Sequence, residues 1–285
     1  MIDFPITDTH VHLLDTRRFS YSWAAGAPKL GRDWTIADLT ARAAPYVIEN
    51  MVFAEVDVDM PQYMDEALWV QSLADQEPRL KGCVACLPLE RGAALEPEME
   101  RLAKLPVMRG IRRLIQNQPD PDFAVKPDFV AAVKLLPKYG LSFDICIYHH
   151  QFPAVLKLVR QCPDVSFILD HIGKPGIRDG LTEPWKAHIR ELATMPNVVC
   201  KLSGVTTEAD HAHWTRDQLR PYIDHVIACF GFDRLMYGGD WPVCELAGEY
   251  KTWLGVLDWA TAGCTPGEKR KLFRDNGIRA YRLGS

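Results

Sequence analysis

The sequence lacks several features that would mark particular classes of protein. It has no run of about 18 apolar residues, the length that a membrane-spanning helix requires. It has no basic excess, since 33 Lys and Arg are set against 37 Asp and Glu, which argues against nucleic acids and anionic membranes as partners. Its first residues, MIDFPITDTHVH, lack the basic start and apolar run of a secretory signal. We therefore expect a cytoplasmic protein that contacts neither a membrane nor nucleic acid.

Cysteine is present, but not in a pattern that indicates a disulfide framework or a metal site. A chain of this length does not need disulfides, and Cys146 and Cys200 lie in apolar runs, where a free thiol behaves as a small hydrophobic group. Cys83 and Cys86 lie three residues apart in an expected strand, so their side chains point to opposite faces. This pair cannot share a metal ion, and we expect all eight thiols to be reduced.

The sequence also lacks a glycine-rich phosphate-binding fingerprint after its first β-rich run, which removes the main reason to expect a dinucleotide-binding fold. Instead, β-rich runs alternate with segments of helical spacing along the whole chain. The expected strands are 5–12, 51–57, 82–87, 110–115, 141–147, 165–171, 198–202 and 235–239. The helical segments include 129–136, 155–162, 219–226 and 250–257. This alternation predicts an α/β fold, a (β/α)8 TIM barrel formed by a single domain over residues 1–285.

In such a barrel the functional residues lie at the carboxyl ends of the strands. The first expected strand ends with His10 and His12, which share a face and can meet one metal ion or one substrate. The sixth ends with His171 facing inward, and alternation then turns Asp170 toward the helices. The eighth is followed by Asp240 behind two glycines, which allow the backbone to approach the barrel axis.

These residues and three short motifs resemble a known family. The histidine pair after the first strand, the histidine of the sixth and the aspartate of the eighth resemble the amidohydrolase superfamily. The phrases LDHIGKP, VVCKLSG and MYGGDWPVC are similar to its branch of sugar-lactone hydrolases, which includes L-fucono- and L-rhamnono-lactonases. The resemblance covers essentially the whole chain. It implies a distorted barrel with His10, His12, His171 and Asp240 at the site.

The residues are compatible with one divalent metal ion, of which zinc fits best, held by His10, His12 and Asp240. The fourth and fifth strands offer no bridging acid, so two metal ions are not expected. His149 or His150 could add a ligand or simply face solvent. The branch contains metal-bearing and metal-free lactonases, so catalysis without a metal stays open.

The sequence contains no GxSxG nucleophile elbow, which favours a water molecule as the nucleophile. We expect Asp240 to take a proton from this water and His171 to orient the substrate. Arg112, or a metal ion, would polarise the lactone carbonyl. Its neighbour Arg113 must face the opposite way, and the resemblance favours Arg112 as the inward residue. The product is expected to be an aldonic acid, within carbohydrate metabolism.

Further residues are candidates for substrate binding. They are Glu55, Tyr148, Lys174, Trp241 and Trp23, with Tyr21 and Lys201 as weaker candidates. The aromatic members could stack on a sugar ring or belong to the core. Partners beyond a small sugar lactone are not indicated, and oligomeric state, a homo-oligomer included, stays open.

Three other functions compete with this hypothesis. A lactonase for a dicarboxylate lactone of aromatic degradation would need several inward arginines, for which Arg17, Arg18, Arg112 and Arg178 are available. A metal-dependent decarboxylase of the same superfamily would need a tightly held metal ion. A non-catalytic sugar-binding barrel would not need the histidines and the aspartate together.

Overall fold

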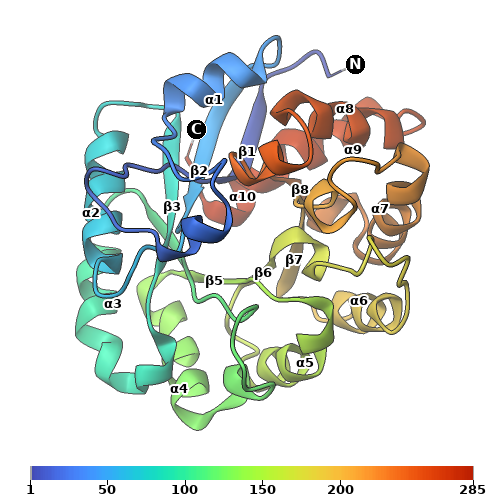
Figure 1. Cartoon of the computed structure of the whole chain (residues 1–285). Helices are drawn as coiled ribbons and strands as arrows, with labels where there is room; N and C mark the ends of the chain where they lie inside the picture. The colour runs from blue at the N-terminus through green and yellow to red at the C-terminus, as the bar shows by residue number, and fades with distance from the viewer. Residues whose placement is uncertain (1, 285) are drawn as a thin grey trace.

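The computed structural model describes residues 2–284 and contains one eight-stranded parallel sheet in the order β1 to β8. The strands are β1 (Ile6–Val11), β2 (Ile48–Ala54), β3 (Leu80–Cys86), β4 (Met108–Arg112), β5 (Ser142–Ile145), β6 (Phe167–Leu169), β7 (Val198–Leu202) and β8 (Leu235–Tyr237). The sheet curls into a barrel, with its strands at the centre of the molecule (Figure 1). The edges meet where His12 N donates to the carbonyl of Trp241 at 2.7 Å and Asp240 N donates to that of His10 at 2.9 Å.

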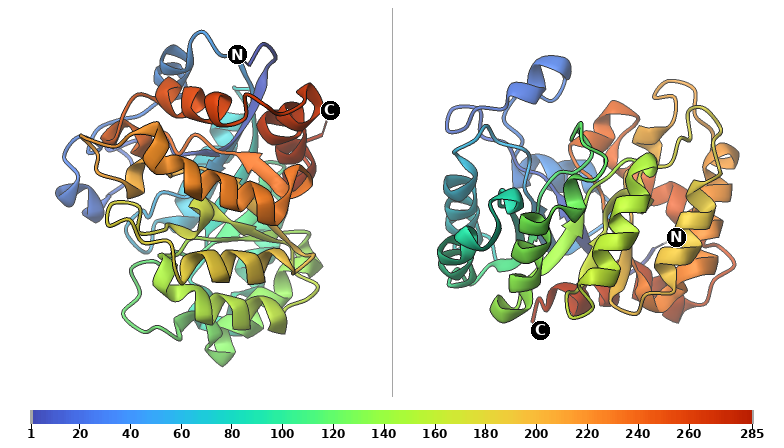
Figure 2. Two further views of the ribbon diagram at one scale, coloured as in Figure 1. Left: turned by 90° about the vertical axis from the view of Figure 1, so that its right-hand side faces the viewer. Right: turned by 90° about the horizontal axis from the view of Figure 1, so that it is seen from below.

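Helices surround the barrel on its outside, as Figures 1 and 2 show. They are α1 (Ile36–Ala43), α2 (Tyr63–Ala74), α3 (Glu96–Ala103), α4 (Pro127–Leu135), α5 (Phe152–Gln161), α6 (Trp185–Ala193), α7 (Arg216–Phe230), α8 (Tyr250–Ala260), α9 (Pro266–Arg270) and α10 (Asn276–Tyr281). The predicted (β/α)8 TIM barrel is confirmed, and all eight expected strands are present. In residues 2–284, no helix is both long and apolar enough to cross a membrane.

The strand ends differ by a few residues from those expected. The second strand was expected over 51–57, but β2 is Ile48–Ala54. The chain leaves the sheet after Ala54 because Asp57 adopts a left-handed φ of +54°, which a strand cannot accommodate. Thus Glu55 and Asp57 belong to a loop above the barrel.

Two layers of apolar side chains hold the fold together. The larger lies between the strands and the surrounding helices, and the smaller fills the barrel itself. The smaller one comprises Val52, Val84, Ile168, Met236, Tyr281 and Leu283. Because Tyr281 comes from α10, the C-terminal helix closes the end of the barrel opposite the strand carboxyl ends (Figure 2).

Met236 tests the inner layer. It is buried inside the barrel, so Met236→Ala should leave a cavity and lower the free energy of unfolding by about 2–5 kcal/mol. Val47→Ala is the control, since Val47 is 60 % exposed and its truncation should change stability by less than about 0.5 kcal/mol. Urea denaturation measures both; equal effects would contradict this packing.

The cysteines are free in this structure, and six of the eight are buried. Cys83 and Cys86 both lie on β3 and are buried, and burial raises the pKa of each thiol well above its ordinary value. Both side chains belong to the apolar core of the sheet.

Candidate active site

Four side chains from distant parts of the sequence converge at one end of the barrel, around Oδ1 of Asp240. The Nε2 atoms of His12, His10 and His171 lie 3.4, 3.8 and 3.9 Å from this oxygen. The ring centroids of His10 and His12 are 4.8 Å apart, and those of His10 and His171 are 4.4 Å apart. One carboxylate oxygen is therefore surrounded by three imidazoles: His10 lies in β1, His12 directly follows it, and His171 follows β6.

Two glycines bring Asp240 to this position. A Cβ atom on Gly238 would lie 2.9 Å from Cβ of His10, and one on Gly239 would lie 2.4 Å from Oδ2 of Asp8. Neither position has room for a side chain, so the backbone can run directly beside β1. Asp240 itself has a φ of +55°, a strained conformation of the kind that occurs at functional sites.

Hydrogen bonds orient two of the imidazoles toward the carboxylate. Nδ1 of His12 lies 2.8 Å from the carbonyl oxygen of Ala54. A carbonyl can only accept, so Nδ1 carries the proton and the lone pair of Nε2 is directed at Asp240. His171 is held through Nδ1 by Oγ of Ser203 at 2.9 Å, which also leaves its Nε2 facing the carboxylate.

Burial and neighbouring charges set the ionisation of these groups. Burial lowers the pKa of His10 and of His171 well below the ordinary imidazole value, so both rings are neutral near neutral pH. Burial by itself would raise the pKa of Asp240, but His171, His12 and Lys174 together hold it below its ordinary value. The site thus presents an ionised carboxylate beside the neutral imidazoles of His10 and His171.

The predicted orientation of Asp170 is wrong. It was expected to face the helices, but it is fully buried inside the barrel, where its carboxylate meets Nζ of Lys201 at 2.9 Å and Nη1 of Arg112 at 3.1 Å. The strand ends at Leu169 and His171 has a φ of +53°, so the alternation of a strand does not extend to these residues. His171 reaches the site through this turn, and Asp170 reaches the interior beside it.

Arg112 lies at the centre of a buried ion-pair network. Its Nε donates to Oε1 of Glu55 at 2.7 Å, and Nη1 lies 3.1 Å from Oδ2 of Asp170 and 3.2 Å from Nε2 of His10. Its guanidinium also contacts the backbone carbonyl of Glu55. Two carboxylates thus fix the plane of the Arg112 guanidinium beside His10.

The predicted role of Glu55 in contacting a sugar does not agree with its position. Its carboxylate is fully buried and binds Arg112 and the backbone N of Asp57, at 2.8 Å. Because the chain turns away from β2 here, this carboxylate supports the arginine from behind instead of facing the cavity.

The remaining arginines lie apart from this centre. Arg113 faces outward and pairs with Glu90 at 2.7 Å, as the alternation of residues predicts. Arg17 and Arg18 are exposed and border other hollows of the surface. Arg178 lines a cavity next to the site. Of these five arginines, only Arg112 contacts one of the three imidazoles.

His12, His171 and Asp240 form the floor of a cavity of about 340 Å³, which Arg112, Tyr148 and Lys174 also line, and His10 lies buried beneath this floor. The apolar part of its wall comprises Trp23, Ala27, Leu30, Val56, Leu114, Val243 and Leu246. The predicted residues Trp23, Tyr148 and Lys174 therefore lie where a substrate could contact them. Nε1 of Trp23 donates to the carbonyl of Val56 at 2.9 Å, which fixes the indole against the cavity.

Trp241 was expected to stack on a substrate, but the structure contradicts this. Its side chain is completely buried and packs edge-on against Trp34, with ring centroids 5.3 Å apart. The Trp241 backbone closes the barrel against His12, which turns the indole into the core. Tyr21 does not line the cavity either; its hydroxyl accepts a hydrogen bond from the backbone N of Asp15.

A second buried network lies beneath the floor. Nζ of Lys201 is 2.8 Å from Asp144, 2.9 Å from Asp170 and 3.2 Å from Nδ1 of His10, and Tyr281 donates a hydrogen bond to Asp144. Lys201 has no exposed surface, so it supports His10 from below and does not reach the substrate. The pKa of Asp170, which burial would raise, is held well below its ordinary value by Lys201, His10 and Arg112.

The donor set around Asp240 fits one divalent ion. Ligand atoms of His10, His12 and Asp240 lie within 4.8 Å of one another, and the tautomer of His12 leaves its Nε2 lone pair free. In a second group of described residues, His10, Asp170 and His171, the possible ligand atoms also lie within 4.8 Å of one another. Asp170 already binds two cations, so this group is the less suitable one.

His149 and His150, which were considered as additional ligands, lie outside both groups. His149 is half-buried at the adjoining cavity and His150 is exposed. They follow Tyr148 in a turn that leads into α5, and neither lines the cavity that contains Asp240.

Gly204 provides a test of how closely His171 is positioned. Its φ is +60°, and a Cβ atom there would lie 2.6 Å from Nδ1 of His171. Gly204→Ala should therefore displace the imidazole and lower kcat by about 100-fold. Gly140→Ala is the matched control, because Gly140 has a φ of +65° with nothing within 4 Å, so only strain is added. Equal kcat values for the two folded variants would contradict this assignment.

Comparison with known proteins agrees with this geometry. The chain belongs to the amidohydrolase family, whose pattern it matches over residues 7–283. The protein is therefore an enzyme of that family, built on the barrel described above.

Particular relatives narrow the comparison. The L-fucono-1,5-lactonase of Burkholderia multivorans is 32 % identical, over 97 % of this chain and 95 % of that protein. The L-rhamnono-gamma-lactonase of Scheffersomyces stipitis is 24 % identical over 99 % of this chain and all of that protein. A crystal structure of an amidohydrolase from Burkholderia multivorans with bound zinc is similar with a TM-score of 0.89 and 28 % identity, covering 99 % of this chain and 100 % of that one. The resemblance to the sugar-lactonase branch is confirmed.

Proposed function

We propose that the protein is a lactonase that opens the ring of a sugar-derived aldonolactone to give the aldonic acid. The observation that carries this proposal is the placement of three imidazole Nε2 atoms within 3.9 Å of one buried carboxylate oxygen, at the floor of a cavity. Two of the relatives are sugar lactonases, which supports the same substrate class. A small sugar lactone is the proposed partner, and carbohydrate metabolism in the cytoplasm is the proposed setting.

Asp240 is the proposed general base. Its ionised carboxylate takes a proton from a water molecule, which attacks the lactone carbonyl carbon. The carbonyl oxygen gains negative charge, and the guanidinium of Arg112, at the cavity edge, stabilises it. The carbon–oxygen bond of the ring then breaks, and the protonated Asp240 returns its proton to the departing ring oxygen. His171, fixed by Ser203, orients the water or the carbonyl.

We further propose that His10, His12 and Asp240 hold one divalent ion, with zinc as the best fit to two imidazoles and a carboxylate. The similar Burkholderia multivorans structure contains bound zinc. Such an ion would act as a Lewis acid that polarises the carbonyl. Nη1 of Arg112 lies 3.2 Å from Nε2 of His10. The guanidinium therefore places a positive charge beside one of the nitrogens that would bind the metal ion.

The cavity is less suited to a dicarboxylate lactone. Two free carboxylates would need unpaired cations, but Arg112 already binds Glu55 and Asp170. Lys174 lies 3.8 Å from Glu208, so its charge is also partly balanced. The wall opposite the floor is mainly apolar, with Trp23 among its members, which favours a neutral ligand.

A panel of aldonolactones, assayed with and without a chelator, tests the proposal. Ring opening releases one proton for each lactone, and mass spectrometry should show addition of one water. Loss of carbon dioxide from an aromatic acid would instead indicate a decarboxylase. Failure to hydrolyse any aldonolactone by the folded protein, before and after addition of zinc, would overturn the proposal. If activity is retained in the presence of the chelator, Arg112 and the imidazoles are sufficient to polarise the lactone carbonyl without a metal ion.

A further inference from the structure

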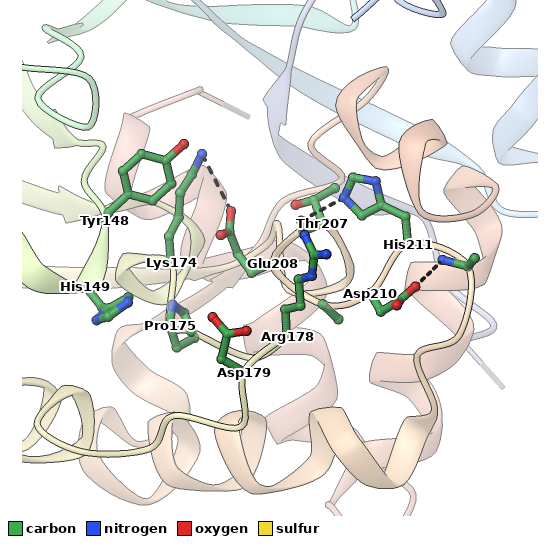
Figure 3. A pocket seen from close by; sticks show the side chains of 13 residues that line it. Tyr148, His149, Lys174, Pro175, Arg178, Asp179, Thr207, Glu208, Asp210 and His211 are labelled. Atoms are coloured by element: carbon green, nitrogen blue, oxygen red, sulfur yellow. Dashed lines mark hydrogen bonds and ion pairs between the residues drawn. The ribbon is translucent and has the colours of Figure 1, made fainter. Parts of the chain in front are cut away.

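A second cavity adjoins the catalytic cavity, and the proposed mechanism does not use it. It has a volume of about 510 Å³ and lies between the loops that follow β6 and β7 (Figure 3). Tyr148 and Lys174 line both cavities, so the two spaces share a wall. The second cavity is larger than the first, which already has to accommodate the lactone ring.

The shared residue Lys174 is held in a strained backbone. His171, Ile172, Gly173 and Lys174 all have left-handed φ values, between +44° and +72°. Such strain at a functional site is maintained by the surrounding structure. Here it places a catalytic imidazole in one cavity and, three residues later, an ammonium at the boundary with the next.

The ammonium of Lys174 retains hydrogen-bonding capacity toward a ligand. Its Nζ lies 3.8 Å from Oε1 of Glu208, an ion pair that is longer than a hydrogen bond, and 5.4 Å from the ring centre of Tyr148. Figure 3 shows Lys174, Glu208 and Tyr148 pointing toward the same space. Glu208 is largely buried, and burial raises the pKa of its carboxyl group. Both members of this pair would gain from additional polar partners.

The charges around the second cavity favour a neutral, hydroxyl-rich ligand. Lys174 and Arg178 line this cavity together with Glu208, Asp179 and Asp210, so charges of both signs face one space. A polyanion would meet these acids, whereas hydroxyl groups can donate to carboxylates and accept from the cations. The phenol ring of Tyr148, which is stacked on His150, lies at the junction between the two cavities.

The second cavity is preformed. Backbone N of Arg178 donates to the carbonyl of Glu208 at 3.0 Å, which joins the two loops that bound it. Nε1 of Trp185 donates to the carbonyl of Ile172 at 2.8 Å, which anchors the strained segment from behind. Because the loops around this cavity are already held in place, the protein loses little conformational entropy when a ligand binds.

We infer that the second cavity is a subsite for a neutral sugar ring attached to the lactone, so that the preferred substrate is a glycosylated aldonolactone. This inference rests on the proposed lactonase function. In a disaccharide lactone, the lactone ring occupies the catalytic cavity, and the second ring lies past Tyr148 and Lys174 with its hydroxyl groups among Arg178, Glu208 and Asp210.

Kinetics on a matched pair of substrates test the subsite. The two substrates are an aldonolactone and the disaccharide lactone that carries a glycosyl group on the same ring. The wild-type protein should have a kcat/KM at least about tenfold higher for the disaccharide lactone, the effect of one hydrogen bond to a charged group, and the gain should appear in KM. Arg178→Met and Glu208→Gln should each reduce this ratio toward one.

A control variant and the alternative outcomes complete the test. Glu191→Gln removes an acid on the outer face of α6, where Glu191 pairs with Arg160, and should keep the wild-type ratio. Equal kcat/KM values for the two lactones, or variants that reduce both values alike, would overturn the subsite alone. Failure of the wild-type protein to hydrolyse either lactone would overturn the lactonase function, and the subsite with it.

Discussion

Replacement of Asp240 by asparagine is expected to lower kcat/KM for lactone hydrolysis by at least about 100-fold, because an amide cannot take the proton from the attacking water. Three imidazole Nε2 atoms lie within 3.9 Å of Oδ1 of Asp240, and this carboxylate lines the cavity, so it is the group placed to activate the water. The asparagine variant should remain folded, since it removes a buried charge without changing the volume. Steady-state rates and circular dichroism measure the two properties.

Asp233→Asn provides the matched control for this substitution. Asp233 is an exposed acid that pairs with Lys271 on the outside of the barrel, and its replacement should leave the rate unchanged. Wild-type turnover by a folded Asp240→Asn protein would show that another group activates the water.

The second large effect is expected at Arg112. Arg112→Met leaves the carboxylate of Glu55 buried without its main partner, and the protein should lose about 3–5 kcal/mol of stability. The double variant Arg112→Met/Glu55→Gln removes both charges and should recover part of that loss. Activity should stay low in both variants, because neither has a guanidinium to stabilise the developing oxyanion.

Arg113→Met is the control that shows whether the losses of stability and activity are specific to Arg112 or follow from removing any arginine of this strand end. Arg113 is half-buried and pairs with Glu90 away from the cavity, so its removal should affect stability less and activity little. Denaturant unfolding and kinetic assays on the four proteins provide the comparison. Full activity of the double variant would contradict a role for Arg112 in catalysis.

Much of the barrel could be predicted because its signals are local. Alternating β-rich and helical segments place all eight strands, and the helical spacing around Val155 and Leu158 predicts α5. The same local reasoning finds the histidines of β1, since residues two apart share a face. It also finds the glycines before Asp240, whose lack of side chains the close backbone contact requires.

Other parts of the site could not be predicted because they depend on where the chain leaves its strands. Asp170 lies inward because His171 has a left-handed φ, which the sequence does not reveal. Glu55 supports Arg112 from behind because β2 ends before it, and Trp241 is buried because its backbone closes the barrel. In each case, one turn changes the direction of a side chain that strand alternation would place elsewhere.

The buried network under His10 was missed for a different reason, although signals for it exist. Asp144 and Lys201 stand as charged residues inside otherwise apolar strand segments, FDICI and VVCKL. An isolated buried charge is costly, so two such residues of opposite sign on nearby strands indicate a pair. Ser203, two residues after Lys201, belongs to the same segment and holds His171.

A single turnover in water enriched in ¹⁸O tests the central chemistry most directly, with the protein in excess over the aldonolactone. Attack by a water molecule that Asp240 activates predicts one ¹⁸O atom in the carboxylate of the aldonic acid and none in the hydroxyl group formed from the ring oxygen. An unlabelled carboxylate after the first turnover would contradict it, because that oxygen would then have come from a carboxylate of the protein.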